Sequence, residues 1–354
     1  MSSTMISDFG ATASRRSRSQ TLRWTLIAIG AVALILAPFL AKNFTVFQFT
    51  LCITYAIAIL GLNYLMGYAG QVSLGHGAFY AVGAYTAAIL IKFAGVPYYL
   101  TLPAAAGLSF VIGLFIGLPA LRLAGHYLAL TTLALAIALP QLLRHDLLAP
   151  LTGGVQGIVI SKPQPPFSLP FEGRYPLPFG MVFDFRLTAD RWLYFFCLAI
   201  AVLTFILIIR LLRSRIGLAL EALRDHPVAA RSMGINLAYH KTVSFAISAM
   251  LTGMAGAMGA IVIQFVAPDS FTLLLSISLV VGSVFGGVTT IWGAVFGAMF
   301  VQFTPNIAGD ISQSAPWAVY GFILIAAMFF MPDGVVGLFT RMRERFMSRR
   351  GARA

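Results

Sequence analysis

Long apolar runs, separated by short polar connections, occupy most of the chain. A helix needs about 20 consecutive apolar residues to cross the hydrocarbon core of a bilayer. The limits of the seventh to ninth runs are the least sharply marked, and the eighth and ninth also fit shorter or partly re-entrant helices. The pattern predicts an all-α polytopic membrane protein with about ten transmembrane helices. These predicted spans are residues 22–41, 44–66, 76–94, 98–120, 124–143, 191–211, 242–264, 272–288, 290–308 and 316–336.

Two of the connections are long enough to carry structure of their own. Residues 144–190 contain seven of the 17 prolines and several glycines. An irregular loop is expected there, because proline lacks the backbone donor that helices and strands use. Residues 212–241 are predicted to be helical instead. The chain then divides into an N-terminal tail, a transmembrane domain and a C-terminal tail, at residues 1–21, 22–336 and 337–354.

Basic residues indicate which connections face the cytoplasm. Cytoplasmic loops of membrane proteins carry an excess of lysine and arginine. If the N-terminus is inside and ten spans alternate, 17 of the 24 basic residues fall on the cytoplasmic side, mostly in both tails and in 212–241. The five basic residues in or beside the 144–190 loop are nearly balanced by acidic ones. We therefore expect both termini and the 212–241 segment to be cytoplasmic, and the 144–190 loop to be external.

The composition supports lipid as the solvent for most of the chain. Of the 354 residues, 59% are hydrophobic and 10% are charged, against about 25% charged in soluble domains. A net charge of +13 would suggest nucleic acid in a soluble protein, but here it follows the membrane connections, so no nucleic-acid partner is expected. The two cysteines, Cys52 and Cys197, lie inside apolar runs without metal-ligand spacing. No metal site is expected.

The sequence contains no evident energy source for transport. Ion-coupled transporters place ionisable residues within their spans, whereas all 11 acidic residues here fall in tails, loops or span ends. None of the four lysines follows a glycine, so the ATP-binding motif GxxxxGK[ST] is missing. The enzyme motifs HExxH, GxSxG and CxxC are missing as well. These observations favour a pore driven by a partner over an ion-coupled transporter, for which His76 and His126 leave a proton relay open, and over a membrane enzyme.

A polar, glycine-rich stretch follows the second predicted span. Uncharged polar groups suit the weak contacts that let a polar solute pass, since strong binding would trap it. The glycines fit either close helix packing or broken helices that line a pathway. Residues 70–78 and 286–294 share the spacing G-x-V-[ST]-x3-G-A, which suggests an internal repeat. The candidate pathway residues are Asn63, Gly70, Gln71, Ser73 and His76.

A short helix is predicted in the middle of residues 212–241. It begins at Pro227, after Asp225 or His226 as N-cap, and ends before Gly234. Proline just inside a helix start and glycine just past its end is the usual asymmetry. A helix of about two turns is marginal alone in water. Its small apolar residues suit a groove on another protein, and the alternative is a helix that rests on the membrane surface.

Several segments resemble the branched-chain amino acid ABC importer permeases. Leu-Thr-Gly-Gly at 151–154 and the chain length favour the LivM type over its LivH partner. Residues 215–225 and the Ala-Ala pair before Gly234 resemble this family's coupling loop, although Val228 stands where the general importer loop has glutamate. This departure weakens any expectation of a carboxylate that pairs with the ATPase. The matching segments are 61–86, 121–132, 151–158, 215–234, 265–271 and 286–293.

The resemblance implies a type II ABC importer-like permease of the bacterial inner membrane, which moves branched-chain or related amino acids by alternating access. Its implied partners are a second homologous permease subunit, two cytoplasmic ATPase subunits and a periplasmic solute-binding protein that selects the solute. ATP and Mg²⁺ would bind the ATPases, and this chain would bind no cofactor. Urea, short amides and aromatic acids stay open as solutes. The residues implied in ATPase coupling are Glu221, Ala222, Arg224, Ala229, Ala230, Met233 and Gly234.

Overall fold

The computed structural model describes most of the predicted transmembrane domain. The described residues are 34–120, 126–165, 174–176, 182–184, 188–311 and short stretches between 318 and 337. They belong to two compact units: residues 1–47 with 164–195, and residues 48–163 with 196–354. The second unit contains every candidate site residue named above.

Within the described part of the chain, seven helices are long and apolar enough to cross a membrane. They confirm a mostly helical, polytopic membrane protein, and each coincides with one of the predicted spans. The helices are α2 (Asn43–Asn63) with its π-helical end η1 (Tyr64–Tyr68), α3 (His76–Ala94), α4 (Tyr98–Ala120), α5 (His126–Arg144), α7 (Ala189–Leu212), α10 (Leu237–Ile263), and α11 (Leu273–Gly286) with the preceding 3₁₀ turn η4 (Pro268–Phe271).

The other three predicted spans have different outcomes. Residues 290–308 do form a helix, α12 (Gly293–Ile311), but it is not among the seven apolar helices of the described residues. Its polar residues Gln302 and Asn306 flank Pro305 and interrupt the apolar sequence. Most of the spans predicted at 22–41 and 316–336, and nearly all of both tails, lie outside the described residues.

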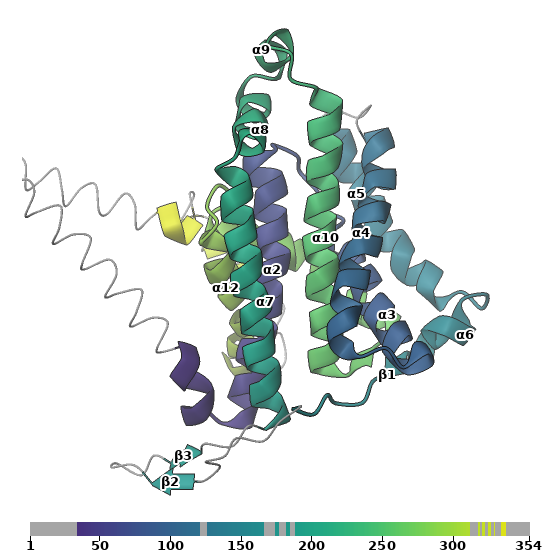
Figure 1. Cartoon of the computed structure of the whole chain (residues 1–354), viewed down its shortest axis with the longest axis vertical. Coiled ribbons are helices and arrows are strands. Elements are labelled where there is room, and N and C mark those ends of the chain that lie inside the picture. Colours follow the sequence, from purple (N-terminus) through teal and green to yellow (C-terminus); the bar gives the residue numbers. More distant parts are fainter. Residues whose placement is uncertain are drawn as a thin grey trace, which may run out of the picture. The chain divides into compact units, whose positions relative to one another are not determined.

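Helix α10 packs closely against α3 and α4 in the second unit (Figure 1). A Cβ atom added at Gly83 on α3 would collide with the backbone of Gly253 on α10. A Cβ atom added at Gly253 would in turn collide with the side chain of Ser109 on α4. Small residues let helix backbones approach in lipid, where no hydrophobic force draws helices together. At these positions the close-packing interpretation of the glycines is therefore correct.

The 144–190 loop contains small structural elements that the apolar pattern did not indicate. In the second unit, α6 (Ala149–Thr152) and η2 (Gly154–Gln156) precede β1 (Ile158–Val159), which pairs antiparallel with β4 (Phe265–Val266). In the first unit, β2 (Arg174–Pro176) and β3 (Val182–Asp184) form an antiparallel pair. The all-α prediction omits both pairs, because strands of two or three residues are too short to show an alternating pattern.

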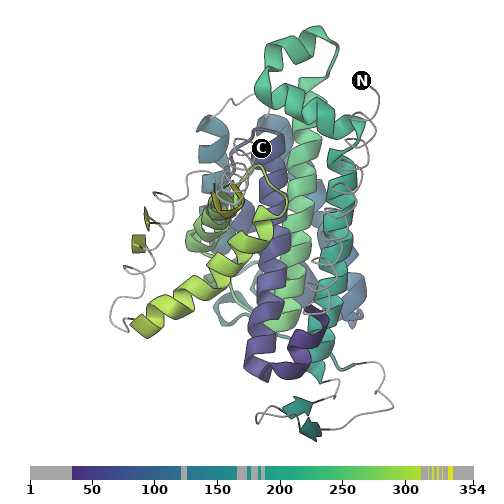
Figure 2. The ribbon, with the colours of Figure 1, turned by 90° about the vertical axis from the view of Figure 1, so that its left-hand side faces the viewer.

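The 212–241 segment forms two helices outside the bundle. Helix α8 (Arg215–Asp225) begins at Ser214, whose hydroxyl accepts a hydrogen bond from the Ile216 N–H, and α9 (Pro227–Ser232) follows directly. Both helices lie at the end of the unit where α10 begins (Figure 2). Helix α6 and strand β1 lie towards the opposite end of this unit (Figure 1).

Candidate functional site

The candidate pathway residues lie at a break between α2 and α3. After Asn63 the helix widens into the π-helix η1, and the chain then runs without helical structure until α3 begins at His76. Gly70 has a φ of +65°, in the left-handed region that suits glycine. The Gln71 N–H closes the turn by donating to the Leu65 carbonyl at 3.1 Å. π-helical turns are rare and often occur at functional positions.

Asn63 is buried and fixes the end of α2 to a second break, residues 287–292 between α11 and α12. Its side-chain amide donates to the Thr290 carbonyl at 2.9 Å and to the Gly287 carbonyl at 3.4 Å. Its side-chain oxygen accepts from the Ser283 hydroxyl at 2.6 Å. These bonds employ both amide hydrogens and the oxygen. Asn63 therefore positions two chain segments, rather than presenting an uncommitted amide to a solute.

His76 is buried and joins three segments through two hydroxyl groups. The Ser248 hydroxyl donates its one hydrogen to the Gly61 carbonyl at 2.6 Å, so it accepts from His76 Nε2, also at 2.6 Å. His76 Nδ1 then accepts from the Ser73 hydroxyl at 3.0 Å, which in turn accepts from the Gly75 N–H at 3.4 Å. We assign these hydrogens so that each group has a partner. His76 thereby links α2, the break and α10, and no described contact continues a proton relay.

Gln71 connects the same break to the beginning of α10. Its side chain is buried, and its amide donates to the Lys241 carbonyl at 3.1 Å. Val72, the next residue, is 47% exposed. The break therefore has one anchored and one accessible side chain next to each other.

Arg224, near the end of α8, contacts this break from the coupling segment. One terminal nitrogen of its guanidinium donates to the Gly67 carbonyl at 2.6 Å, and its Nε donates to the Asp225 carboxylate at 2.8 Å. The hydrogen bond to Asp225 raises the pKa of Arg224, and the same bond lowers the pKa of the Asp225 carboxyl. Both groups are therefore charged at neutral pH.

Helix α9 exposes a small apolar surface at its tip. Val228 and Met233 are 80% and 83% exposed, and Ala229 between them is also exposed. Ala230 is only 4% exposed and faces its own chain. Ala230 was one of the small apolar residues that the sequence suggested for a groove on another protein, together with Ala229 and Met233. It is buried instead, because a six-residue helix beside α8 and α10 must bury one side.

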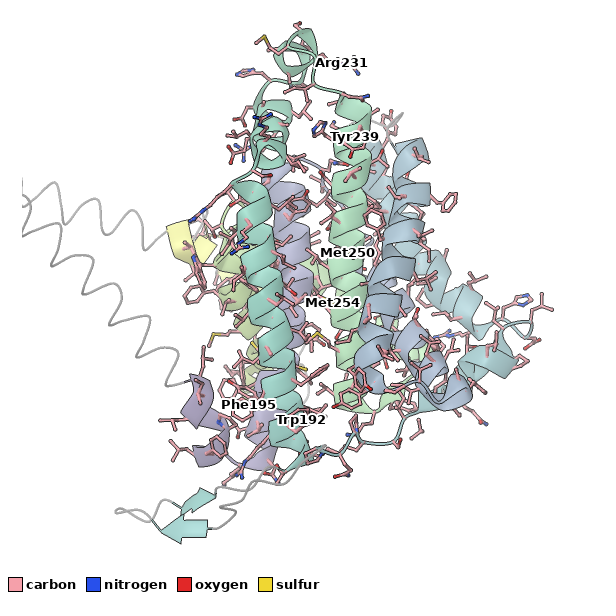
Figure 3. The ribbon with its side chains drawn as sticks, viewed as in Figure 1. Trp192, Phe195, Arg231, Tyr239, Met250 and Met254 are labelled. Carbon is pink, nitrogen blue, oxygen red and sulfur yellow. The ribbon has the colours of Figure 1, made fainter. Side chains whose placement is uncertain are left out.

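The remaining candidate coupling residues lie in α8 or just after the end of α9. Gly234 has the left-handed conformation predicted for a residue that ends a helix, with a φ of +84°. His226 is the N-cap of α9 by position, although its side chain makes no capping hydrogen bond with described residues. Glu221 and Ala222 are half-buried on α8. Figure 3 shows Arg231 at the tip on α9, Tyr239 at the start of α10 and Met250 and Met254 farther along α10.

The two copies of the suspected repeat form equivalent breaks, and the second break touches η1, the helix end that precedes the first break. Residues 70–78 connect η1 to α3, and residues 286–294 connect α11 to α12. A Cβ atom added at Gly67 would collide with the backbone of Val288, and Asn63 bonds to carbonyls of the second break. The shared spacing therefore corresponds to a helix–break–helix arrangement in both places.

Several partners of these residues were missed by sequence reasoning. Ser248 lies within a long apolar helix, and the acceptors at Gly61, Gly67 and Lys241 are backbone carbonyls. Every residue has such a carbonyl, so no residue type marks these positions. Only the repeated spacing at 286–294 carried a signal, and it pointed to the second break.

Comparison with known proteins gives one consistent family. Residues 44–331 match the family described as "branched-chain amino acid transport system / permease component". The high-affinity branched-chain amino acid permease protein LivM of Escherichia coli is 34% identical over 328 residues, which cover 89% of this chain and 76% of the relative. LivM of Salmonella typhimurium is 34% identical over 310 residues, covering 84% and 71%. The probable permease LivH of Methanocaldococcus jannaschii is 27% identical over 287 residues, covering 77% and 85%. No solved structure gives a match.

Proposed function

Because the chain belongs to the family of permease components of branched-chain amino acid transport systems, we propose that it forms part of the membrane pathway of an ABC importer for branched-chain or related amino acids. It is a membrane permease rather than an enzyme. The observation that carries this proposal is the combination of seven membrane-capable helices among the described residues with a protruding helix pair, α8 and α9, at one end of the second unit. Such a pair suits contact with a partner that supplies energy.

The proposed assembly contains four kinds of subunit and is embedded in the bilayer. This chain pairs with a second homologous permease subunit, two ATPase subunits bind at the cytoplasmic face, and a periplasmic binding protein delivers the solute. ATP and Mg²⁺ bind to the ATPases, since this sequence lacks the phosphate-binding motif. The binding protein makes the main choice among branched-chain and related amino acids.

The proposed topology has ten spans in a type II importer-like arrangement of the inner membrane, with both termini cytoplasmic. The positions of α8–α9 and α6–β1 towards opposite ends of the second unit support it, because the charge bias assigns them to opposite sides. The tails 1–21 and 337–354 and the 212–241 segment are cytoplasmic, and residues 144–190 are external.

The proposed coupling surface is the apolar tip of α9. Val228, Ala229 and Met233 are exposed at an end that faces water in this topology. Apolar side chains exposed together at a protein surface commonly mark a binding site. Glu221, Ala222, Arg224, Ala230 and Gly234 support this surface from within the chain rather than forming its apolar contact.

The proposed moving part of the pathway is the pair of breaks at 69–75 and 287–292, of which the first follows η1 and the second packs against it. Broken helices place irregular backbone where it lines a cavity in membrane transporters. Asn63, Ser73 and His76 hold the breaks in place through their hydrogen bonds, and Gly70 and Gln71 connect them to the coupling segment. In this role the polar residues determine the shape of the pathway.

Reconstitution tests the proposed function directly. The chain is purified with its candidate permease partner and ATPases, placed in vesicles, and supplied with binding protein loaded with leucine. The expected result is ATP hydrolysis that rises with the loaded binding protein, together with leucine uptake. Uptake driven by a proton or sodium gradient without ATPase subunits would overturn the proposal. Transport of urea or aromatic acids without any amino-acid uptake would change the solute class alone.

A further inference from the structure

We infer that Arg224 is a positioning residue that transmits movement of the coupling helices to the break between α2 and α3. This inference rests on the proposed function, in which a partner ATPase moves α8 and α9. In this role the Arg224 side chain and the Gly67 carbonyl connect the docking surface to the pathway. Gln71 provides a second connection between the same two parts of the chain.

The Arg224 contact joins a charged donor to the end of a helix. The last carbonyls of a helix have no intrahelical partner, and cations are favoured there. The guanidinium donates to Gly67, in η1, at 2.6 Å, while Asp225 holds its Nε at 2.8 Å. A Cβ atom added at Gly70 would approach the Arg224 Cγ to 2.9 Å. The arginine stem therefore lies directly on the backbone of the break.

The Gln71 contact bonds the break to the part of the chain that follows α9. Its amide donates to the Lys241 carbonyl, near the start of α10, at 3.1 Å. Along the chain, α9 lies between Arg224 and Lys241, and Figure 3 shows Arg231 and Tyr239 within this intervening segment. The break is thus bonded to the chain both before and after the docking helix. A rotation of α9 that separates α8 from the start of α10 must strain or move the break.

The movement has a route onward to the second break. Gly67 packs against the backbone of Val288, so closely that a Cβ atom would collide. Asn63, which precedes η1, bonds to the carbonyls of Gly287 and Thr290. A displacement of η1 therefore acts on both breaks, through contacts that leave little room for independent movement. The chain of contacts runs from α8 to η1 and from η1 to residues 287–290.

The first test measures coupling in the reconstituted complex. Arg224→Gln removes the charge-assisted bonds while keeping a polar, uncharged side chain that is too short to reach Gly67. We expect leucine uptake per ATP hydrolysed to fall about tenfold in the complex that assembles. Uptake per ATP in Arg224→Lys should lie between the values for the unmodified chain and for Arg224→Gln. An ammonium group keeps the charge but cannot bond to Gly67 and Asp225 together as the guanidinium does. Arg215→Gln is the matched control, since Arg215 is exposed on the same helix and has no hydrogen bond or ion pair with described residues.

The second test follows the break itself, so that a merely structural role is distinguished. Val72→Cys is introduced into a chain in which Cys52 and Cys197 are replaced by alanine, because Val72 is exposed within the break. Its labelling rate by a maleimide is compared between the nucleotide-free and vanadate-trapped complexes. The rate should change on trapping when Arg224 is present, and it should stay constant in Arg224→Gln.

The outcomes separate this inference from the proposed function. Full coupling and a normal labelling change in Arg224→Gln would overturn the role of Arg224 while leaving the permease function intact. Failure of Arg224→Gln to assemble, together with an assembled and fully coupled Gln71→Leu, would also overturn it. If the unmodified complex shows neither stimulated hydrolysis nor uptake, the proposed function itself is wrong.

Discussion

At the scale of single residues, the buried polar groups work as connectors between segments. The Ser248 hydroxyl is the clearest case, because it donates to Gly61 and accepts from His76, both at 2.6 Å. Such a hydroxyl lies between a backbone carbonyl of α2 and a side chain at the start of α3. Its removal leaves the buried Nε2–H of His76 without this partner and takes one hydrogen bond from the Gly61 carbonyl.

Ser248→Ala is therefore expected to destabilise the chain. An unsatisfied buried donor or acceptor costs about 1–3 kcal/mol, and no other described group lies in position to replace the hydroxyl. The midpoint of thermal unfolding in detergent should fall clearly, with a smaller effect on hydrolysis by the assembled complex. Ser270→Ala is the control, since Ser270 is exposed in η4. Equal midpoints for the two variants would contradict the assigned hydrogen-bond chain.

At the scale of helices, glycine determines how closely α3, α4 and α10 pack. Gly83 and Gly107 make a matched pair, because both lie inside helices of this group. A Cβ atom at Gly83 collides with the backbone of α10, whereas one at Gly107 meets no described atom within 4 Å. Gly83→Ala should cost about 1–3 kcal/mol through overpacking. Gly107→Ala should be neutral or slightly stabilising, because alanine is the better helix former. Thermal unfolding of both variants checks this, and a stable Gly83→Ala would refute the close contact.

The exposed tip of α9 makes a second prediction at this scale. Val228→Ser removes an apolar side chain that is 80% exposed and touches little of its own chain. If Val228 binds an ATPase groove, its loss should weaken the complex by about 1–2 kcal/mol, as for one of the minority of interface residues whose loss costs more than about 1 kcal/mol. Less ATPase should then co-purify at the same expression level. Val155→Ser, in η2 between α6 and β1 and 68% exposed, should leave ATPase recovery unchanged. Equal recovery in both variants would remove Val228 from the docking surface.

Ala230 illustrates what the sequence could and could not predict about the site. Proline and glycine signals predicted α9 and the left-handed Gly234, because both residues restrict the backbone locally. Which side of a six-residue helix is buried depends on neighbouring helices, and the pattern of α9 alone does not contain that information. Ala230→Trp would therefore damage the fold of the segment first, so it is a poor test of docking.

At the scale of the whole molecule, apolar length was the strongest sequence signal. It located seven spans within a few residues of the observed helices, since about 20 apolar residues can be hidden only in lipid. The breaks near Gly70 and Gly287 were indicated by a repeated spacing, but the contact between η1 and the second break was not. That contact depends on backbone atoms of Gly67 and Val288, which come together only after α2, α11 and α12 have packed.

The topology yields the last prediction, and it concerns two exposed side chains in the second unit. Leu147 and Met233 are each 83% exposed, and they lie in the connections that the charge bias assigns to opposite sides. Single cysteines at these positions, in a chain without Cys52 and Cys197, are treated with a membrane-impermeant maleimide. In right-side-out vesicles, Leu147→Cys should label at once and Met233→Cys only after permeabilisation. The order should reverse in inside-out vesicles, which controls for intrinsic reactivity. Labelling of both from one side would contradict the topology. In that topology α7 crosses the membrane once between the two positions and so places them on opposite sides.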